Sequence, residues 1–211
     1  MPPRDRERYH HGDLRRALLE AGLDLTRTGG PAALSLREVT RRVGVTPNAA
    51  YRHFADRKSL VQGVAEAIQH RMVARMRAAR RASPATSAAE AARVQLRAVG
   101  LGYIHFALAE PGWFSVAFFG EPELRLADLS APASPPAPFL LLVDALDAME
   151  AAGCLTPERR AGAEWPCFAA VHGFAVLALD GPLQHQPRAA VDRWAARTVD
   201  DIITGLQQVR S

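Results

Sequence analysis

The segment from Arg37 to His53 holds the side chains of this sequence that are best suited to binding chemistry. Arginine forms forked hydrogen bonds with phosphate, and asparagine can hold adenine through two hydrogen bonds. Tyrosine and histidine can donate hydrogen bonds to phosphate or sugar oxygens. The residues of these types in the segment are Arg37, Arg41, Arg42, Asn48, Tyr51, Arg52 and His53. Their combination indicates contact with nucleic acid.

Signals for catalysis or for a bound metal are missing from the sequence. It contains no His-Glu-x-x-His motif, no pair of Glu-x-x-His motifs, no phosphate-binding glycine loop and no nucleophile elbow. Its two cysteines, Cys154 and Cys167, have no Cys-x-x-Cys partner, so neither a zinc site nor a disulfide framework is expected. We therefore predict a protein that is not an enzyme and that has no cofactor and no metal.

The positive charge of the 211-residue chain is concentrated in its first part. Residues 1–81 contain 17 Lys or Arg against 8 Asp or Glu, whereas residues 82–211 contain 9 against 14. A basic segment joined to a mildly acidic remainder indicates a module for polyanions attached to a second part. Since the sequence has no uninterrupted apolar run of about 18 residues and no apolar stretch after its basic start, we expect a cytoplasmic protein.

Four helices are predicted in the basic part. Apolar residues recur at helical spacing over residues 11–28, and Ser35 and Glu38 match a capping box that begins a second, short helix. Thr46 and Pro47 suit the start of a third helix that reaches Phe54. Asp56 caps a long fourth helix that runs to Arg81. Its apolar stripe consists of Leu60, Val64, Ile68, Met72 and Met76.

The second and third of these helices form a helix-turn-helix. Gly44 stands at the turn, where the chain must reverse without a side chain in the way. The small core that fixes the angle between the helices is predicted from Val39, Val43, Val45, Ala50 and Phe54.

The first quarter of the chain resembles the N-terminal domain of the tetracycline-repressor (TetR) family of bacterial transcriptional regulators. The matching segments, in the same order and at the same spacing, are residues 9–15, 36–39, 43–45, 51–54 and 58–60. Thr40 stands where the family usually has alanine, which leaves the fold assignment intact.

The resemblance implies that the third helix enters the major groove of DNA. Asn48 is the expected reader of bases, and Lys58, near the start of the fourth helix, is the expected phosphate contact. Residues 4–11 are either a disordered arm that reaches along the DNA or an untethered terminus. The predicted DNA contacts are Ser35, Arg37, Thr46, Asn48, Ala49, Tyr51, Arg52, His53 and Lys58.

The remainder of the chain also has helical patterns and no convincing paired strands. Helices are expected over residues 87–109, 113–119, 137–152, 157–179 and 187–208, with a proline-rich loop at 130–136. The predicted fold is all-α, with about nine helices: a three-helix helix-turn-helix domain linked by a long fourth helix to a helical bundle. The predicted boundaries are 1–55 for the arm and DNA-binding domain, 56–82 for the connecting helix and 83–211 for the ligand-binding and dimerisation domain.

Part of this second region resembles the WHG-type ligand domain of one TetR branch. The resemblance lies in residues 103–108, 111–114, 119–120 and 171–174, with Phe168 where the branch usually has tryptophan. The aromatic residues here either enclose an apolar cavity for a small effector or simply fill a core. The predicted ligand contacts are Tyr103, Phe106, Trp113, Phe114, Phe118, Phe139, Trp165, Phe168 and His172.

The last two long helices have more apolar surface than one buried face needs, which predicts a four-helix interface between two subunits. Small residues in the earlier helix allow a neighbour to approach closely. The predicted interface residues are Ala169, Gly173, Val176, Trp194, Thr198, Ile202 and Leu206.

Three functions are compatible with these patterns. The favoured one is a homodimeric repressor that binds a palindromic or near-palindromic operator in double-stranded DNA and is released by a small, largely apolar effector. The others are a helical-bundle enzyme with a fused helix-turn-helix and an architectural DNA-binding protein without an effector. The sequence does not specify the effector, the operator or the choice between repressor and activator.

Overall fold

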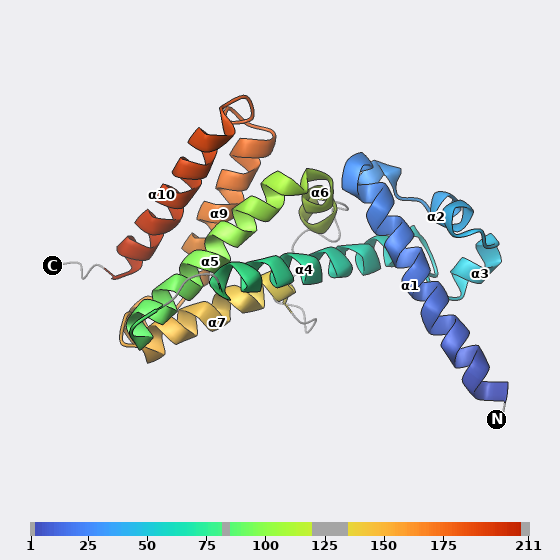
Figure 1. Cartoon of the computed structure of the whole chain (residues 1–211), viewed down its shortest axis with the longest axis horizontal. Helices are drawn as coiled ribbons and strands as arrows, with labels where there is room; N and C mark the ends of the chain where they lie inside the picture. Colours follow the sequence, from blue (N-terminus) through green and yellow to red (C-terminus); the bar gives the residue numbers. More distant parts are fainter. Residues whose placement is uncertain (1–2, 82–84, 120–134, 208–211) are drawn as a thin grey trace. The chain divides into compact units, whose positions relative to one another are not determined.

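The structure is a computed structural model that describes residues 3–81, 85–119 and 135–207 (Figure 1). Of residues 3–12, 80–81 and 119 only the backbone is described. The described residues form ten α-helices and one short 3-10 helix, with no strand among them, so the all-α prediction is confirmed. Most of the predicted proline-rich loop, residues 130–134, lies outside the described residues.

The chain divides into two compact units. The first comprises residues 1–69 and 110–133, and the second comprises residues 70–109 and 134–211. Helices of the first unit are α1 (Pro3–Gly29), η1 (Pro31–Ala33), α2 (Leu36–Val43), α3 (Pro47–Tyr51), the beginning of α4 (Arg57–Arg81) and α6 (Pro111–Phe119). Helices of the second unit are the rest of α4, α5 (Ala88–Ala109), α7 (Ala137–Ala151), α8 (Pro157–Arg160), α9 (Glu164–Leu179) and α10 (Arg188–Gln207).

The first unit has a small core to which α1, α2, α3 and α4 contribute. Leu18 of α1, Val39 of α2 and Leu60 of α4 are fully buried, and Ala50 and Phe54 complete the contact around α3. Val43 and Val45, also predicted for this core, are only half-buried. Burial of these apolar side chains, rather than local helix propensity, stabilises such short helices.

Helix α6 packs against α1 in the first unit, although it follows α5 of the second unit in the chain. Gly112 permits the contact, because a Cβ atom there would lie 2.4 Å from the carbonyl oxygens of Thr26 and Arg27. The indole Nε1 of Trp113 donates to the Leu23 carbonyl at 2.8 Å. Glu110, which is 3% exposed, accepts two hydrogen bonds of 2.7 and 2.8 Å from the Arg27 guanidinium.

In the second unit α5 is the central helix, with α7, α9 and α10 packed around it. Gly102 of α5 lets Met76 of α4 approach closely, since a Cβ atom at this glycine would lie 2.8 Å from the Met76 Cγ atom. Helix α10 contributes a buried stripe of four residues to this core. They are Val191, Ala195, Val199 and Ile203. α9 and α10 pack along one another (Figure 1).

Three helices differ from the sequence-based expectation by more than two residues at a boundary or by an interruption. α1 begins at Pro3, so residues 4–11 continue the first helix and do not form a disordered arm. α3 ends at Tyr51, short of the expected Phe54. The expected helix over 157–179 is divided into α8 and α9, because Gly162 between them adopts a left-handed backbone with φ of 74°.

The α8–α9 segment, Pro157–Leu179, is also long and apolar enough by composition to cross a membrane. In the structure it is interrupted at Gly162, and its apolar residues divide between the core and the surface of the second unit. A core helix of a folded domain meets the same criterion, so composition alone does not assign a membrane span here.

Candidate nucleic-acid interface

The α2–turn–α3 segment is held by hydrogen bonds at both ends of α2. The Ser35 hydroxyl accepts from the Glu38 backbone N–H at 3.2 Å. At the other end Gly44 adopts a left-handed backbone with φ of 77°, and its N–H donates to the Thr40 carbonyl at 2.9 Å. A residue with a Cβ atom is strained in this conformation, which explains the glycine. Pro47 then occupies the first turn of α3, as expected.

Five of the predicted DNA contacts form an exposed set on this segment, which we call the α2–α3 surface: Arg37, Thr46, Asn48, Tyr51 and Arg52. The Tyr51 side chain is notable because it remains 53% exposed although its ring is apolar. Tyrosine in this state offers a hydroxyl and a flat face to a partner at little conformational cost. The α2–α3 surface thus presents a guanidinium pair, an amide and a phenol to solvent.

The Ser35 hydroxyl is engaged as the cap of α2, so Ser35 positions the helix. Thr40, the departure from the family pattern, is 2% exposed, and its hydroxyl donates to backbone carbonyls within α2. Ala49 is half-buried. Thr46 stands at the predicted start of α3, but its side chain makes no capping hydrogen bond, which corrects that part of the prediction.

A capping box would also have the Glu38 carboxylate accept a hydrogen bond from the Ser35 backbone N–H, but this carboxylate has another partner. The Glu38 carboxylate instead forms a forked ion pair with Arg41, one turn later on α2. This hydrogen bond lowers the pKa of Glu38 below its usual value. Arg41 is therefore paired within its own helix, although it is exposed to solvent like Arg37 and Arg42.

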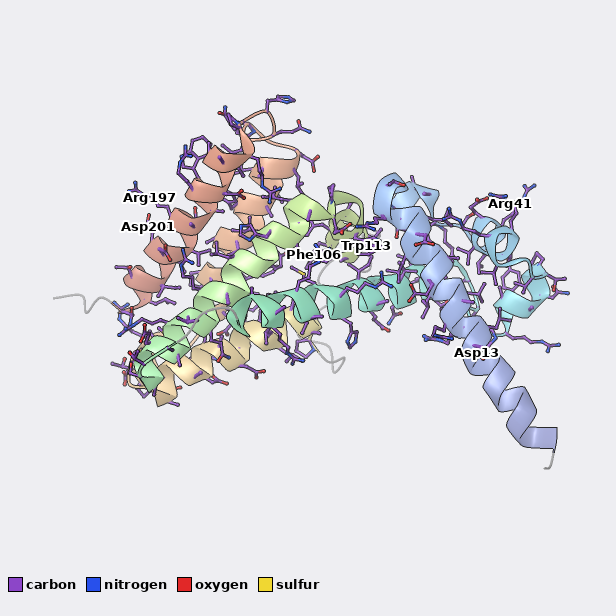
Figure 2. The ribbon with its side chains drawn as sticks, in the orientation of Figure 1. Asp13, Arg41, Phe106, Trp113, Arg197 and Asp201 are labelled. Atoms are coloured by element: carbon purple, nitrogen blue, oxygen red, sulfur yellow. The ribbon has the colours of Figure 1, made fainter. Side chains whose placement is uncertain are left out.

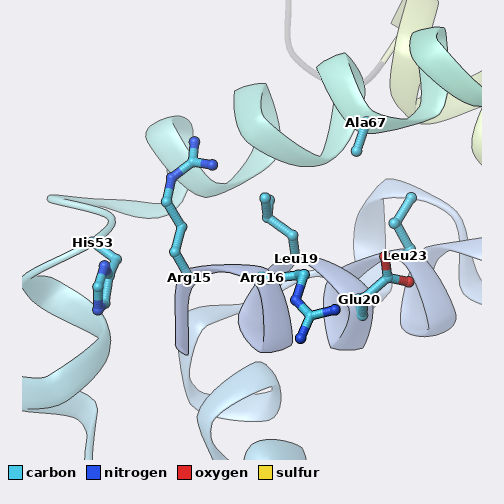
Figure 3. Close-up of a pocket in the computed structure, with 7 residues that line it drawn as sticks. All are labelled: Arg15, Arg16, Leu19, Glu20, Leu23, His53 and Ala67. Carbon is cyan, nitrogen blue, oxygen red and sulfur yellow. The ribbon is translucent and has the colours of Figure 1, made fainter. Parts of the chain in front are cut away.

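His53, another of the predicted DNA contacts, is less exposed than the residues of the α2–α3 surface. It is half-buried and lines a hollow of about 540 Å³ in the first unit (Figure 3). Arg15 and Arg16 of α1 line the same cavity, and the Arg15 guanidinium lies 5.4 Å from the centre of the Phe54 ring. Sequence reasoning missed these two arginines as neighbours of α3, although both lie in or beside a segment that matched the family.

The start of α4 holds Lys58 exposed at its second position. Asp56 and Ser59 cap the helix reciprocally: the Ser59 N–H donates to the Asp56 carboxylate at 2.7 Å, and the Asp56 N–H donates to the Ser59 hydroxyl at 3.2 Å. The hydrogen bonds from Ser59 lower the pKa of Asp56. Arg57 donates to the carbonyls of Leu34 and Pro31, which ties the start of α4 to η1.

In the second unit, five of the predicted ligand contacts meet in one cluster, which we call the aromatic cluster: Tyr103, Phe139, Trp165, Phe168 and His172. The Tyr103 hydroxyl and His172 Nδ1 are hydrogen-bonded at 2.8 Å, and the Phe168 ring stacks on His172 with centres 5.2 Å apart. Phe139 contacts both Trp165 and Phe168. Burial raises the pKa of Tyr103 and lowers the pKa of His172, so both are neutral near pH 7.

The other predicted ligand contacts lie elsewhere. Phe106 is buried in the second unit beneath the Arg75 guanidinium, which lies 5.6 Å from the ring centre. Trp113, Phe114 and Phe118 belong to the first unit, where α6 packs on α1, so they do not join the aromatic cluster. They were predicted to join the other ligand contacts because they follow α5 closely in sequence, but the chain passes from the second unit to the first at Glu110.

Helices α9 and α10 expose large apolar side chains. Leu177 is 46% exposed and Trp194 is 40% exposed, and Trp165 at the start of α9 is 49% exposed. Thr198, Ile202, Leu206 and Val176 are half-buried, Ala169 is exposed, and a Cβ atom on Gly173 would meet no atom within 4 Å. The predicted interface residues thus lie outside the buried stripe of α10. We call Leu177, Trp194 and Ile202 the α9–α10 surface.

Comparison with known proteins gives matches along most of the chain. Residues 18–64 match the bacterial regulatory proteins of the tetR family, and residues 96–202, just over half of the chain, match the tetracyclin repressor-like C-terminal domain. No curated protein matches the sequence.

Solved structures match over nearly the whole chain. A protein of unknown function from Rhodococcus sp. RHA1 is 30% identical, with a TM-score of 0.71, over 95% of this chain and 98% of its own. A TetR variant from Acinetobacter baumannii AYE in complex with minocycline is 21% identical, with a TM-score of 0.63, over 92% and 96%. A TetR transcriptional regulator from Streptomyces coelicolor is 20% identical, with a TM-score of 0.63, over 92% and 97%. The last two show a shared fold.

Proposed function

This chain belongs to the TetR family of bacterial DNA-binding regulators, and from that premise we propose that it is a homodimeric repressor released from its operator by a small effector. The observation that carries the proposal is the α2–α3 surface, where Asn48 and Tyr51 stand exposed on a helix fixed by the Gly44 turn. Polar side chains held on a rigid helix are what base and phosphate recognition requires.

In this proposal the DNA-contacting residues of the first unit are of two kinds: readers, which contact base edges, and anchors, which contact phosphates and sugars. Asn48 pairs with a base edge in the major groove, because its amide has both a donor and an acceptor. Arg37, Thr46, Tyr51, Arg52 and Lys58 contact phosphates and sugars, and Ala49 contributes an apolar contact to the groove. Ser35 supports DNA binding indirectly, because it caps α2 and so positions that helix. His53 contacts the DNA from beside the cavity that it lines together with Arg15 and Arg16.

The α9–α10 surface supports the proposed homodimer. Leu177 and Trp194 are exposed, and covering them with a second copy of the chain lowers the free energy of the dimer. Around a two-fold axis the α9–α10 surface of one subunit would contact the same surface of the other. Dimerisation also places two copies of α3 on a palindromic operator, since one short helix-turn-helix has too few base contacts for useful specificity. Ala169, Gly173, Val176, Thr198, Ile202 and Leu206 complete the proposed interface.

The aromatic cluster supports an effector site in the second unit. It joins α5, α7 and α9 around one polar pair, Tyr103 and His172, which could orient a largely apolar molecule. The minocycline complex of the Acinetobacter baumannii protein shows that this fold can hold a small organic ligand. For a regulator of this family we propose a cytoplasmic location, where the DNA lies.

A reporter gene placed behind the region upstream of this protein's own gene tests the regulatory role. A repressor lowers reporter expression when the protein is supplied, and Gly44→Val, which strains the turn of the helix-turn-helix, abolishes that effect. A rise in expression would instead identify an activator. Unchanged expression, with the protein folded and bound to this region in vitro, would contradict regulation at this site and favour an architectural role.

A further inference from the structure

The second unit contains a groove between α4, α5 and α10 whose lining residues are all different from those of the aromatic cluster. Its volume is about 520 Å³, which is in the range of small-molecule sites in proteins. Ten residues line it: Arg75, Ala79, Leu101, Gly102, His105, Phe106, Ala109, Arg188, Asp192 and Ala196. The groove therefore combines a charged rim with an apolar interior.

The charged groups of the groove come from three different helices. Arg75 lies on α4, His105 on α5, and Arg188 and Asp192 on α10. Asp192 accepts from Arg188 at 2.9 Å and lies 3.7 Å from the His105 Nε2 atom. The lining holds two arginines and one aspartate, and these three groups together carry a net charge of +1.

The interior of the groove is apolar and closely packed. Phe106 is 1% exposed and lies beneath the Arg75 guanidinium, which is thereby held over the ring by a cation–π contact. Gly102 brings α4 and α5 together without an intervening side chain. The remaining apolar lining residues are Ala79, Leu101, Ala109 and Ala196.

We propose that this groove binds a small organic monoanion, a carboxylate attached to an apolar ring or chain. Arg75 and Arg188 hold the carboxylate, since a guanidinium matches its two oxygens with two parallel hydrogen bonds. The apolar part lies along Leu101 and Ala196. A single negative charge neutralises the net charge of the lining, whereas a doubly charged phosphate would add repulsion from Asp192.

Isothermal titration calorimetry of the full chain with 2-naphthoate tests the site without DNA. We expect one naphthoate per chain, and affinity at least about tenfold lower for the uncharged 2-naphthamide, which keeps the ring and loses the charge. Arg75→Gln and Arg188→Gln each weaken naphthoate binding about tenfold. Asp192→Asn strengthens it several-fold, because the competing carboxylate of the protein is removed.

Arg197→Gln is the matched control, because Arg197 is an exposed arginine on the same helix that pairs with Asp201 and not with the groove (Figure 2). It should leave binding unchanged. If an arginine variant fails to fold, as judged by circular dichroism, Ala196→Leu tests the site by filling the groove, and it should abolish binding.

Several results would overturn the proposal. They are no naphthoate binding at about millimolar concentration, equal binding of naphthoate and naphthamide, and displacement of naphthoate by inorganic phosphate at equal concentration. Loss of binding in Phe168→Ala together with retained binding in Arg75→Gln and Arg188→Gln would place the ligand in the aromatic cluster. Since no DNA is present, failure of this site leaves the repressor proposal standing.

Discussion

The α2–α3 surface and the α9–α10 surface are both exposed, but they differ in chemistry. The first presents Arg37, Asn48 and Arg52, which are stable in water without a partner. The second presents Leu177 and Trp194, whose contact with water costs free energy until something covers them. The α2–α3 surface therefore suits a partner that is bound reversibly, and the α9–α10 surface suits a permanent partner.

The three tryptophans of the chain show the same contrast within one residue type. Trp113 is 5% exposed and fixes α6 to α1, whereas Trp165 and Trp194 are 49% and 40% exposed. A buried tryptophan contributes to the stability of one chain, and an exposed one contributes to association. Substitutions at Trp113 and Trp194 should thus separate folding from the proposed dimerisation.

The largest expected effect is on the dimer. Trp194→Glu should weaken self-association at least about a hundredfold, because a two-fold interface meets the buried charge twice. Arg197→Glu, a charge change at an exposed position of the same helix, is the control and should have little effect. Sedimentation velocity over a range of concentrations measures both. A wild-type chain that stays monomeric, or a Trp194→Glu variant that dimerises normally, would refute the proposed interface.

A smaller effect is expected on the stability of the first unit. Trp113→Ala should lower the free energy of unfolding by about 3–5 kcal/mol, since it removes a buried ring. Trp113→Phe keeps most of the packing and loses only the hydrogen bond to Leu23, so about 1–2 kcal/mol is expected. Urea denaturation followed by circular dichroism measures both. A loss below about 1 kcal/mol in Trp113→Ala would mean that α6 is not fixed to α1 in this way.

A substitution in the α2–α3 surface and one at the start of α4 should affect DNA binding differently: the first should reduce sequence preference, and the second should reduce affinity for every sequence. Asn48→Ala should cost about 1–3 kcal/mol on the operator and reduce the preference over other sequences. Lys58→Ala should weaken binding to all duplexes about equally and reduce the salt dependence. Fluorescence anisotropy with operator and shuffled duplexes measures both. Equal losses of specificity in the two variants would invalidate the division into reader and anchor.

The smallest effect concerns pH and the aromatic cluster. Burial lowers the pKa of His172 in the folded chain below its ordinary value of 6.5, so the unfolded chain takes up the proton first. Stability from this group is complete above pH 6.5 and is lost as the pH falls through the folded pKa. The difference in melting temperature between wild type and His172→Gln should therefore shrink on acidification from pH 7 to pH 5. A constant difference would show that His172 is not held neutral.

Local signals predicted much of the first unit. Gly44, the Ser35 cap and the Asp56 cap act within a few residues, so their patterns carried over directly into α2, α3 and α4. The apolar stripe of α4 is likewise buried as predicted from its spacing. The left-handed Gly162 is a local signal too, although the continuous pattern over 157–179 concealed it.

The unpredicted features depend on contacts distant in sequence. The place of α6 is fixed by Glu110 and Trp113 against residues of α1 more than eighty positions earlier. His53 lines one cavity together with Arg15 and Arg16 of α1, which are distant from it in sequence. The groove between α4, α5 and α10 needs three helices to meet, and no spacing along the chain indicates that Arg75 and Arg188 line the same space.

Sequence-specific recognition is tested most directly by selecting duplexes from a random pool with the full chain and then measuring their affinity by fluorescence anisotropy at near-physiological salt. We predict enrichment of a palindromic sequence and an affinity about a thousandfold or more above that for its shuffled control, and this preference should be reduced in Asn48→Ala. Equal binding to selected and shuffled duplexes, or no binding to either, would contradict sequence-specific recognition by the α2–α3 surface.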